Sequence, residues 1–127
     1  MTALIIAIPG VPPSVNRAYR NTAGGGKRRT TEVVAWQTKV GQVVSNAAIW
    51  AEWHLPEHTP FTVAVALTAP RPYAFDADNC LKLCLDAVVL ALDLDDRYIV
   101  ALTVTKARAP EAATRVTVAA VAAVAER

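Results

Sequence analysis

The residues best suited to chemistry in this sequence are carboxylates that gather around one apolar stretch. Asp76 and Asp78 come just before that stretch, and Asp95-Asp96 comes just after it. In an extended segment, side chains two residues apart point the same way. If the second pair returns beside the first, three or four carboxylates meet at one point. Mutual repulsion would make such a cluster costly, and an oxygen-liganded Mg²⁺ or Mn²⁺ ion would relieve it.

A lysine accompanies these carboxylates. Lys82 is four residues after Asp78 and four before Asp86, so the three side chains share one helical face. With a metal ion activating a water for attack on phosphorus, the ammonium would stabilise charge that develops on the phosphate. A purely structural alternative makes Asp78 a helix N-cap, Lys82 an ion-pair partner and Asp95-Asp96 a turn. Spacing alone favours this alternative.

Charge is separated along the chain although the net charge is only +2. The first 31 residues contain no acidic residue and five basic ones, namely Arg17, Arg20, Lys27, Arg28 and Arg29. Residues 76–96 contain six aspartates and the single cation Lys82. Carboxylates that hold a cation and a basic surface that holds a polyanion suit a metal-dependent enzyme acting on phosphates. The alternative is a solvated loop and a solvated turn.

Composition limits the class of protein. The 127 residues are 54% hydrophobic and 19% charged, which excludes global disorder and fits a single domain over residues 1–127. Cys80 and Cys84 form neither a disulfide framework nor a zinc site, and we interpret them as buried thiols. No apolar run is long enough to span a bilayer, and the N-terminus lacks the basic region of a signal peptide. We expect a cytoplasmic protein with no membrane partner.

The hydrophobic periods predict the elements that must position these residues. Strand periods appear at residues 4–8, 61–68, 98–104 and 116–120, and helical periods at 31–53 and 78–92. The order is β-α-β-α-β-β, which predicts an α+β fold with a single mixed sheet and two helices packed on it. Gly24-Gly25-Gly26 followed by Lys27-Arg28-Arg29 predicts a mobile basic loop. The apolar face of the second helix is predicted to contain Leu81, Leu85, Val88, Val89 and Leu92.

Other side chains are weaker candidates. Tyr73 and Phe75, in the loop before Asp76, could stack on nucleobases or close over the core. The three tryptophans are expected to be core or interface anchors. They are Trp36, Trp50 and Trp53. His54 and His58 are separated by Pro56, so we expect a surface role for them.

Three motifs together resemble the RusA family of Holliday junction resolvases. They are PPSVNR at residues 12–17, DADN at residues 76–79 with Lys82 and Asp86, and Asp95-Asp96 opening a strand. The resemblance follows most of the chain in order. It implies a small homodimeric, Mg²⁺-dependent endonuclease that nicks four-way DNA junctions symmetrically in recombination and repair. Such enzymes are often carried by phages and prophages.

The resemblance also implies roles for individual residues. Asp76, Asp78 and Asp96 resemble the family's metal-binding catalytic carboxylates, and Lys82 resembles its catalytic lysine. Asp95 matches a motif position and is a further candidate metal ligand. The residues expected to bind DNA are Asn16, Arg17, Arg20, Lys27, Arg28, Arg29, Arg71, Tyr73 and Asn79. The best-known member has a run of arginines where this chain has residues 71–75, so we expect the basic arm to supply more of the affinity.

The symmetry of a four-way junction favours a homodimer, because paired nicks need two related sites. We expect an apolar interface from Trp50, Trp53 and the stretch 116–124. A non-cleaving DNA-binding or phage accessory protein is the alternative function, and a metal-binding module without nucleic acid is a third. Lys82 beside the carboxylates favours the endonuclease, since DNA binding alone has no use for an acidic cluster.

Overall fold

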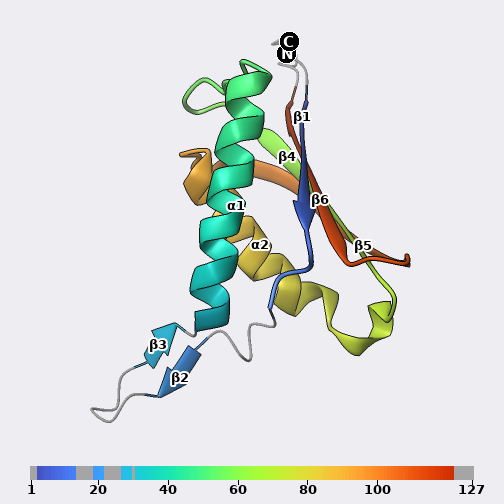
Figure 1. Cartoon of the computed structure of the whole chain (residues 1–127). Coiled ribbons are helices and arrows are strands. Elements are labelled where there is room, and N and C mark those ends of the chain that lie inside the picture. Colours follow the sequence, from blue (N-terminus) through green and yellow to red (C-terminus); the bar gives the residue numbers. More distant parts are fainter. Residues whose placement is uncertain (1–2, 14–18, 22–26, 30, 122–127) are drawn as a thin grey trace.

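Four strands form a mixed sheet that makes up one layer of the fold, with the helices on one side of it (Figure 1). The computed structural model describes residues 3–13, 19–21, 27–29 and 31–121. The sheet order is β1-β6-β4-β5. Its strands are β1 (Leu4–Pro9), β6 (Ala113–Ala120), β4 (Phe61–Ala69) and β5 (Ile99–Arg108). The β1–β6 and β6–β4 pairs are antiparallel and the β4–β5 pair is parallel, which confirms the predicted mixed sheet.

Two helices cover one face of this sheet. α1 (Thr31–Trp50) packs against β1 and α2, and α2 (Ala77–Ala91) also contacts β5. The covered face is apolar and includes Ile6, Val65, Val116 and Val118, which are fully buried. The predicted dimer interface is therefore wrong for the start of 116–124, because these valines belong to the core. Residues 122–124 lie outside the described residues.

The buried faces of the two helices differ in how well the sequence predicted them. α1 buries Val33, Trp36, Val40 and Val44, as its period predicts. The buried stripe of α2 runs through Cys80, Leu83, Cys84, Ala87 and Val88. The predicted Leu81, Leu85, Val89 and Leu92 are only half-buried beside it. Both cysteines act as apolar core residues, and burial raises the pKa of the Cys84 thiol to about 12.

A small hairpin lies in the segment predicted as a basic loop. β2 (Tyr19–Asn21) pairs antiparallel with β3 (Lys27–Arg29) just before α1 (Figure 1). The prediction of a mobile loop is therefore wrong for residues 27–29. A strand pair is held together by hydrogen bonds between backbone groups. A run of three basic residues has no alternation of apolar and polar side chains, so the sequence did not predict this hairpin. Asn16 and Arg17 lie outside the described residues.

The segment that carries the chemistry is a β4–α2–β5 crossover. A 3₁₀ turn, η2 (Pro72–Ala74), leads from β4 into α2, and another, η3 (Asp96–Tyr98), leads from α2 into β5. Because β4 and β5 are parallel, these two turns lie at opposite ends of α2. Among the described helices, none has the length and apolar character needed to cross a membrane.

Candidate active site

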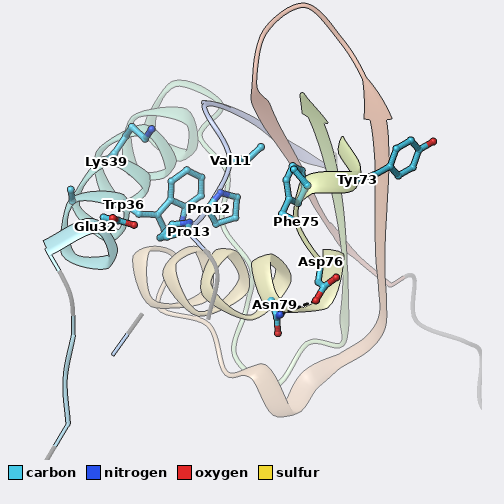
Figure 2. Close-up of a pocket in the computed structure, with 12 residues that line it drawn as sticks. Val11, Pro12, Pro13, Glu32, Trp36, Lys39, Tyr73, Phe75, Asp76 and Asn79 are labelled. Carbon is cyan, nitrogen blue, oxygen red and sulfur yellow. Dashed lines mark hydrogen bonds between the residues drawn. The ribbon is translucent and has the colours of Figure 1, made fainter. Parts of the chain in front are cut away.

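Two exposed carboxylates stand at the N-terminal end of α2. Asp76 occupies the N-cap position in an extended conformation, and Asp78 lies in the first turn. Asp76 Oδ2 accepts a hydrogen bond from Asn79 Nδ2 at 3.2 Å (Figure 2), and Asp78 Oδ1 accepts one from the Asn79 backbone N–H at 3.0 Å. The positive end of the helix dipole favours negative charge here. Asn79 therefore connects both carboxylates, and Asp76 takes the N-cap position predicted for Asp78.

Asp95 and Asp96 lie at the other end of the same helix. α2 has 15 residues, so its two ends are separated by roughly 20 Å. In the part of the chain that the structure describes, no group of three or more His, Cys, Asp or Glu side chains could hold one metal ion. The condition under which three or four carboxylates would meet at one point is therefore not met within the described part of a single chain. A crossover helix separates the end of one parallel strand from the start of the next, and this geometry keeps the two pairs apart.

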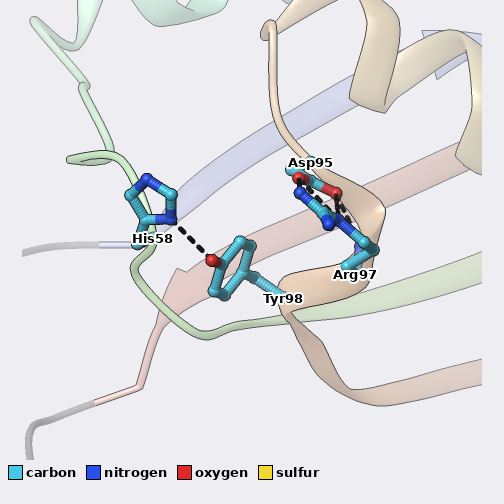
Figure 3. Close-up of polar contacts among 4 residues, drawn as sticks. All are labelled: His58, Asp95, Arg97 and Tyr98. Carbon is cyan, nitrogen blue, oxygen red and sulfur yellow. Dashed lines mark hydrogen bonds and ion pairs between the residues drawn. The ribbon is translucent and has the colours of Figure 1, made fainter.

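The two neighbouring aspartates differ sharply in their contacts. The Asp95 carboxylate accepts bonds from Arg97 Nη2 at 2.6 Å, from Nε at 3.0 Å and from the backbone N–H at 3.0 Å (Figure 3). These contacts lower the pKa of Asp95 and raise that of Arg97. Within the described residues, the exposed Asp96 side chain makes no hydrogen bond or ion pair. Asp96 is thus available for an external ligand, whereas Asp95 is engaged in capping η3.

A second contact fixes the far end of η3. His58 Nδ1 and the Tyr98 hydroxyl are 2.6 Å apart, and the two rings meet edge to face (Figure 3). His58 has a φ of 61°, a left-handed conformation that costs a non-glycine residue free energy. The His58 side chain is exposed, as predicted, and it links the segment before β4 to the turn that carries Asp96.

Lys82 pairs with Asp86 rather than with Asp78. Its Nζ lies 3.2 Å from Asp86 Oδ2, and the two side chains are 64% and 48% exposed. An exposed pair of this kind contributes little to stability. The ammonium can therefore leave Asp86 at small cost and turn toward a ligand bound near Asp78.

A protein-family model matches most of this chain. The model described as endodeoxyribonuclease RusA matches residues 9–119 of the 127-residue chain. The chain belongs to the RusA endodeoxyribonuclease family. No curated protein matches it. The matched range includes both carboxylate pairs, Lys82 and the β2–β3 hairpin, so the resemblance seen in the motifs is confirmed. Membership supports, at the level of the family, an endodeoxyribonuclease that acts on Holliday junctions.

The structure adds a residue that the sequence analysis missed. Lys106, on β5, donates from Nζ to the Phe75 carbonyl oxygen at 3.0 Å. Its ammonium also lies 5.6 Å from the ring centroid of Tyr73 and 5.5 Å from that of Phe75. Lys106 thus fixes the loop that leads to Asp76 in this RusA-family chain. In the sequence, Lys106 continues the alternation of Leu102 and Val104, at a position where the strand period predicts an apolar residue. This departure from the pattern could have identified it.

Most of the described residues predicted to bind DNA lie in two regions, the loop before α2 and the β2–β3 hairpin. Arg71 and Tyr73 are exposed in the loop before α2, and Tyr73 is 84% exposed with its ring directed outward (Figure 2). Arg20, Lys27, Arg28 and Arg29 belong to the β2–β3 hairpin. Tyr73 thus remains a candidate for stacking on a base, while Phe75 lies partly buried against the core.

Proposed function

We propose that this RusA-family chain is a Mg²⁺-dependent endonuclease that resolves four-way DNA junctions by paired nicks. The observation that carries the proposal is the exposed pair Asp76 and Asp78 at the N-terminus of α2, joined by Asn79. Both carboxylates face solvent, and neither forms an ion pair within the described residues. In a chain of a DNA-cutting family, they are the groups best placed to act on the DNA backbone.

These carboxylates suit the proposed ion. Mg²⁺ is commonly bound through one or two carboxylates together with waters and substrate phosphates. Asp76 and Asp78 would supply the carboxylates, and Mn²⁺ accepts the same oxygen ligands. When bound, such an ion lowers the pKa of a coordinated water and withdraws charge from the phosphate.

The remaining roles fall to basic side chains. Lys82 is one turn beyond Asp78 and would stabilise negative charge that develops on the phosphate. Arg71, beside the site, would bind a neighbouring backbone phosphate. The hairpin residues Arg20 and Lys27–Arg29 would hold the duplex arms through contacts that depend on salt.

A homodimer would bring the two carboxylate pairs together. Within α2, the exposed positions are Asp78, Lys82, Asp86 and Leu90, which form one stripe. If two α2 helices pack antiparallel about a two-fold axis, Lys82 of each faces Asp86 of the second copy. Asp78 then approaches the C-terminal end of the second α2, where η3 carries Asp96. We propose that each site combines Asp76 and Asp78 of one copy with Asp96 of the other.

One observation favours the alternative of a non-cleaving DNA-binding protein. The described part of a single chain does not gather three metal ligands. A monomer of this kind would bind branched DNA through its basic residues and leave the backbone intact. Oligomeric state and cleavage therefore have to be measured on the same preparation.

The test is incubation of the protein with labelled four-way junction and with linear duplex, in Mg²⁺ or EDTA. We expect paired symmetric nicks in the junction, in Mg²⁺ only. Asp78→Asn should abolish nicking and bind the junction at least as tightly, because it removes negative charge near a phosphate. Normal turnover by Asp78→Asn would refute the site. Junction binding without nicking by the wild type, in Mg²⁺ and in Mn²⁺, would support the non-cleaving alternative.

A further inference from the structure

A cleft of about 830 Å³ opens beside Asp76, within the size range of small-molecule sites. Pro12, Trp36 and Lys39 line one side, and Phe75, Asp76 and Asn79 line the other (Figure 2). We propose that this cleft receives one unstacked nucleobase of the strand being cut. The proposal rests on the proposed function, since it needs a DNA strand at Asp76.

An unpaired buried donor points to a ligand that accepts a hydrogen bond. Trp36 is only 4% exposed, and its indole Nε1 has no hydrogen-bond partner among the described residues. Buried polar groups are almost always paired, so this N–H is an exception. Trp36 lines the cleft. Nucleobases present carbonyl and ring-nitrogen acceptors at their edges, which is what an indole N–H can bind.

The walls suit the flat faces of a base. Phe75 is half-buried, and Lys106 holds its backbone carbonyl at 3.0 Å, which fixes the loop that presents the ring. The indole of Trp36, which is almost wholly buried, lies on the other side of the cleft beside Pro12 (Figure 2). Aromatic side chains bind single-stranded bases by stacking, with little dependence on sequence.

The charge of the lining favours a neutral ligand over a second phosphate. The charged residues of the lining are Glu32, Lys39 and Asp76, so acidic groups outnumber basic ones. The Lys39 ammonium is engaged, because it donates to the Pro9 carbonyl oxygen at 2.6 Å and lies 5.0 Å from the Trp36 ring centroid. An anion would meet net repulsion here, whereas an uncharged base would not.

The position beside Asp76 gives the cleft a role in selecting the substrate. Successive nucleotides of a strand are only about 3.4 Å apart along the helix axis, so a base attached next to the scissile phosphate is within reach. Extruding a base costs least where stacking is already broken. At a branch point the bases lose stacking neighbours, and in a linear duplex they keep them. A base-binding cleft would therefore favour junctions over linear DNA.

A thermodynamic cycle tests the inference without requiring cleavage. Dissociation constants are measured by fluorescence anisotropy in Ca²⁺, for the wild type and Trp36→Phe, on an intact four-way junction. The same measurements use junctions with one abasic site, moved through the positions flanking the branch point. We expect one abasic position to weaken wild-type binding about tenfold, as removal of a stacked base does. Trp36→Phe should weaken intact-junction binding and respond less than the wild type to that abasic site, because both changes remove the hydrogen bond to Nε1.

The controls separate folding from binding. Trp50→Phe alters an indole that is 88% exposed and outside the cleft, so it should respond to the abasic site as the wild type does. A thermal melt checks that Trp36→Phe is folded. If that variant is unstable, the same cycle is measured with Phe75→Leu, which changes the opposite wall of the cleft. Abasic sites without effect, or effects that add independently, would overturn the base-binding inference. Failure of the proposed function would show instead as no nicking by the wild type in Mg²⁺.

Discussion

At the residue scale, the neighbouring acids of η3 have different tasks. Asp95 binds the backbone and guanidinium of Arg97 and so shapes the turn. Asp96 makes no side-chain hydrogen bond or ion pair within the described residues, so its exposed carboxylate could accept a ligand. The sequence could place a pair of acids here, but it could not say which one faces outward, because that depends on the turn that Asp95 caps.

This difference predicts the effect of two matched substitutions. Asp96→Asn should reduce junction nicking by at least ~10²-fold if this carboxylate helps to hold the ion. Asp95→Asn should have a smaller effect, because it weakens the interaction with Arg97 but leaves the Asp96 carboxylate. Single-turnover nicking in Mg²⁺ measures both. A larger loss for Asp95→Asn than for Asp96→Asn would reverse the assignment.

Lys82 offers a second test, because its ion pair can be removed from either side. Lys82→Ala should lower turnover by ~10²-fold or more if the ammonium stabilises charge in the transition state. Asp86→Asn removes the same 3.2 Å pair and keeps the ammonium, so turnover of the dimeric fraction should stay within a few-fold of the wild type. Equal, small effects of the two variants on rate, with similar small losses in thermal stability, would mean that Lys82 serves only as an ion-pair partner.

At the element scale, periodicity predicted both helices and all four strands of the main sheet. Strand and helix periods depend on local burial, which a sequence records directly. The convergence of the carboxylates depended instead on the direction of β5. A crossover helix makes β5 parallel to β4, so the start of β5 lies at the edge opposite the N-terminus of α2. The β-α-β order already contained this information, and applying the crossover rule would have separated the two pairs.

Other features were not predictable from local pattern. The buried stripe of α2 differs from the predicted one because Cys80 and Cys84 pack as core residues. Sequence alone does not decide this, since cysteine occurs both in cores and at reactive surfaces. The burial of Trp36 Nε1 without a hydrogen-bond partner among the described residues also depends on packing that the helical period does not specify.

The exposed stripe of α2 predicts where the dimer should be sensitive. Leu90 is 77% exposed and would lie near Asp78 of the second copy. Leu90→Glu would bring like charges together there and should convert the dimer to a monomer at micromolar concentration, as measured by light scattering. Ile5→Glu is the control, because Ile5 is 63% exposed on the sheet and should leave the dimer intact. A dimer that survives Leu90→Glu would exclude pairing through α2.

At the scale of the whole molecule, the separation of charge would divide the proposed tasks of holding and cutting DNA between two regions of the chain. The basic hairpin should bind phosphates with a strength that falls as salt rises. Replacing Lys27, Arg28 and Arg29 by Gln should flatten the slope of log K against log salt by about 0.9 for each phosphate that is no longer neutralised. Arg115→Gln, on the strand β6, is the control and should leave the slope unchanged. An unchanged slope for the triple variant would show that these three residues do not contact DNA phosphates.

In the proposed dimer, each DNA-cutting site is shared between two copies of the chain. Asp76→Asn and Asp96→Asn chains, carrying different tags, are co-expressed, and the heterodimer is isolated through both tags. In a shared arrangement one site carries both changes and the other carries neither. The heterodimer should therefore nick a labelled four-way junction at about half the wild-type rate, while each mutant homodimer is inactive. A heterodimer as inactive as both mutant homodimers, beside an active wild type, would contradict the shared site.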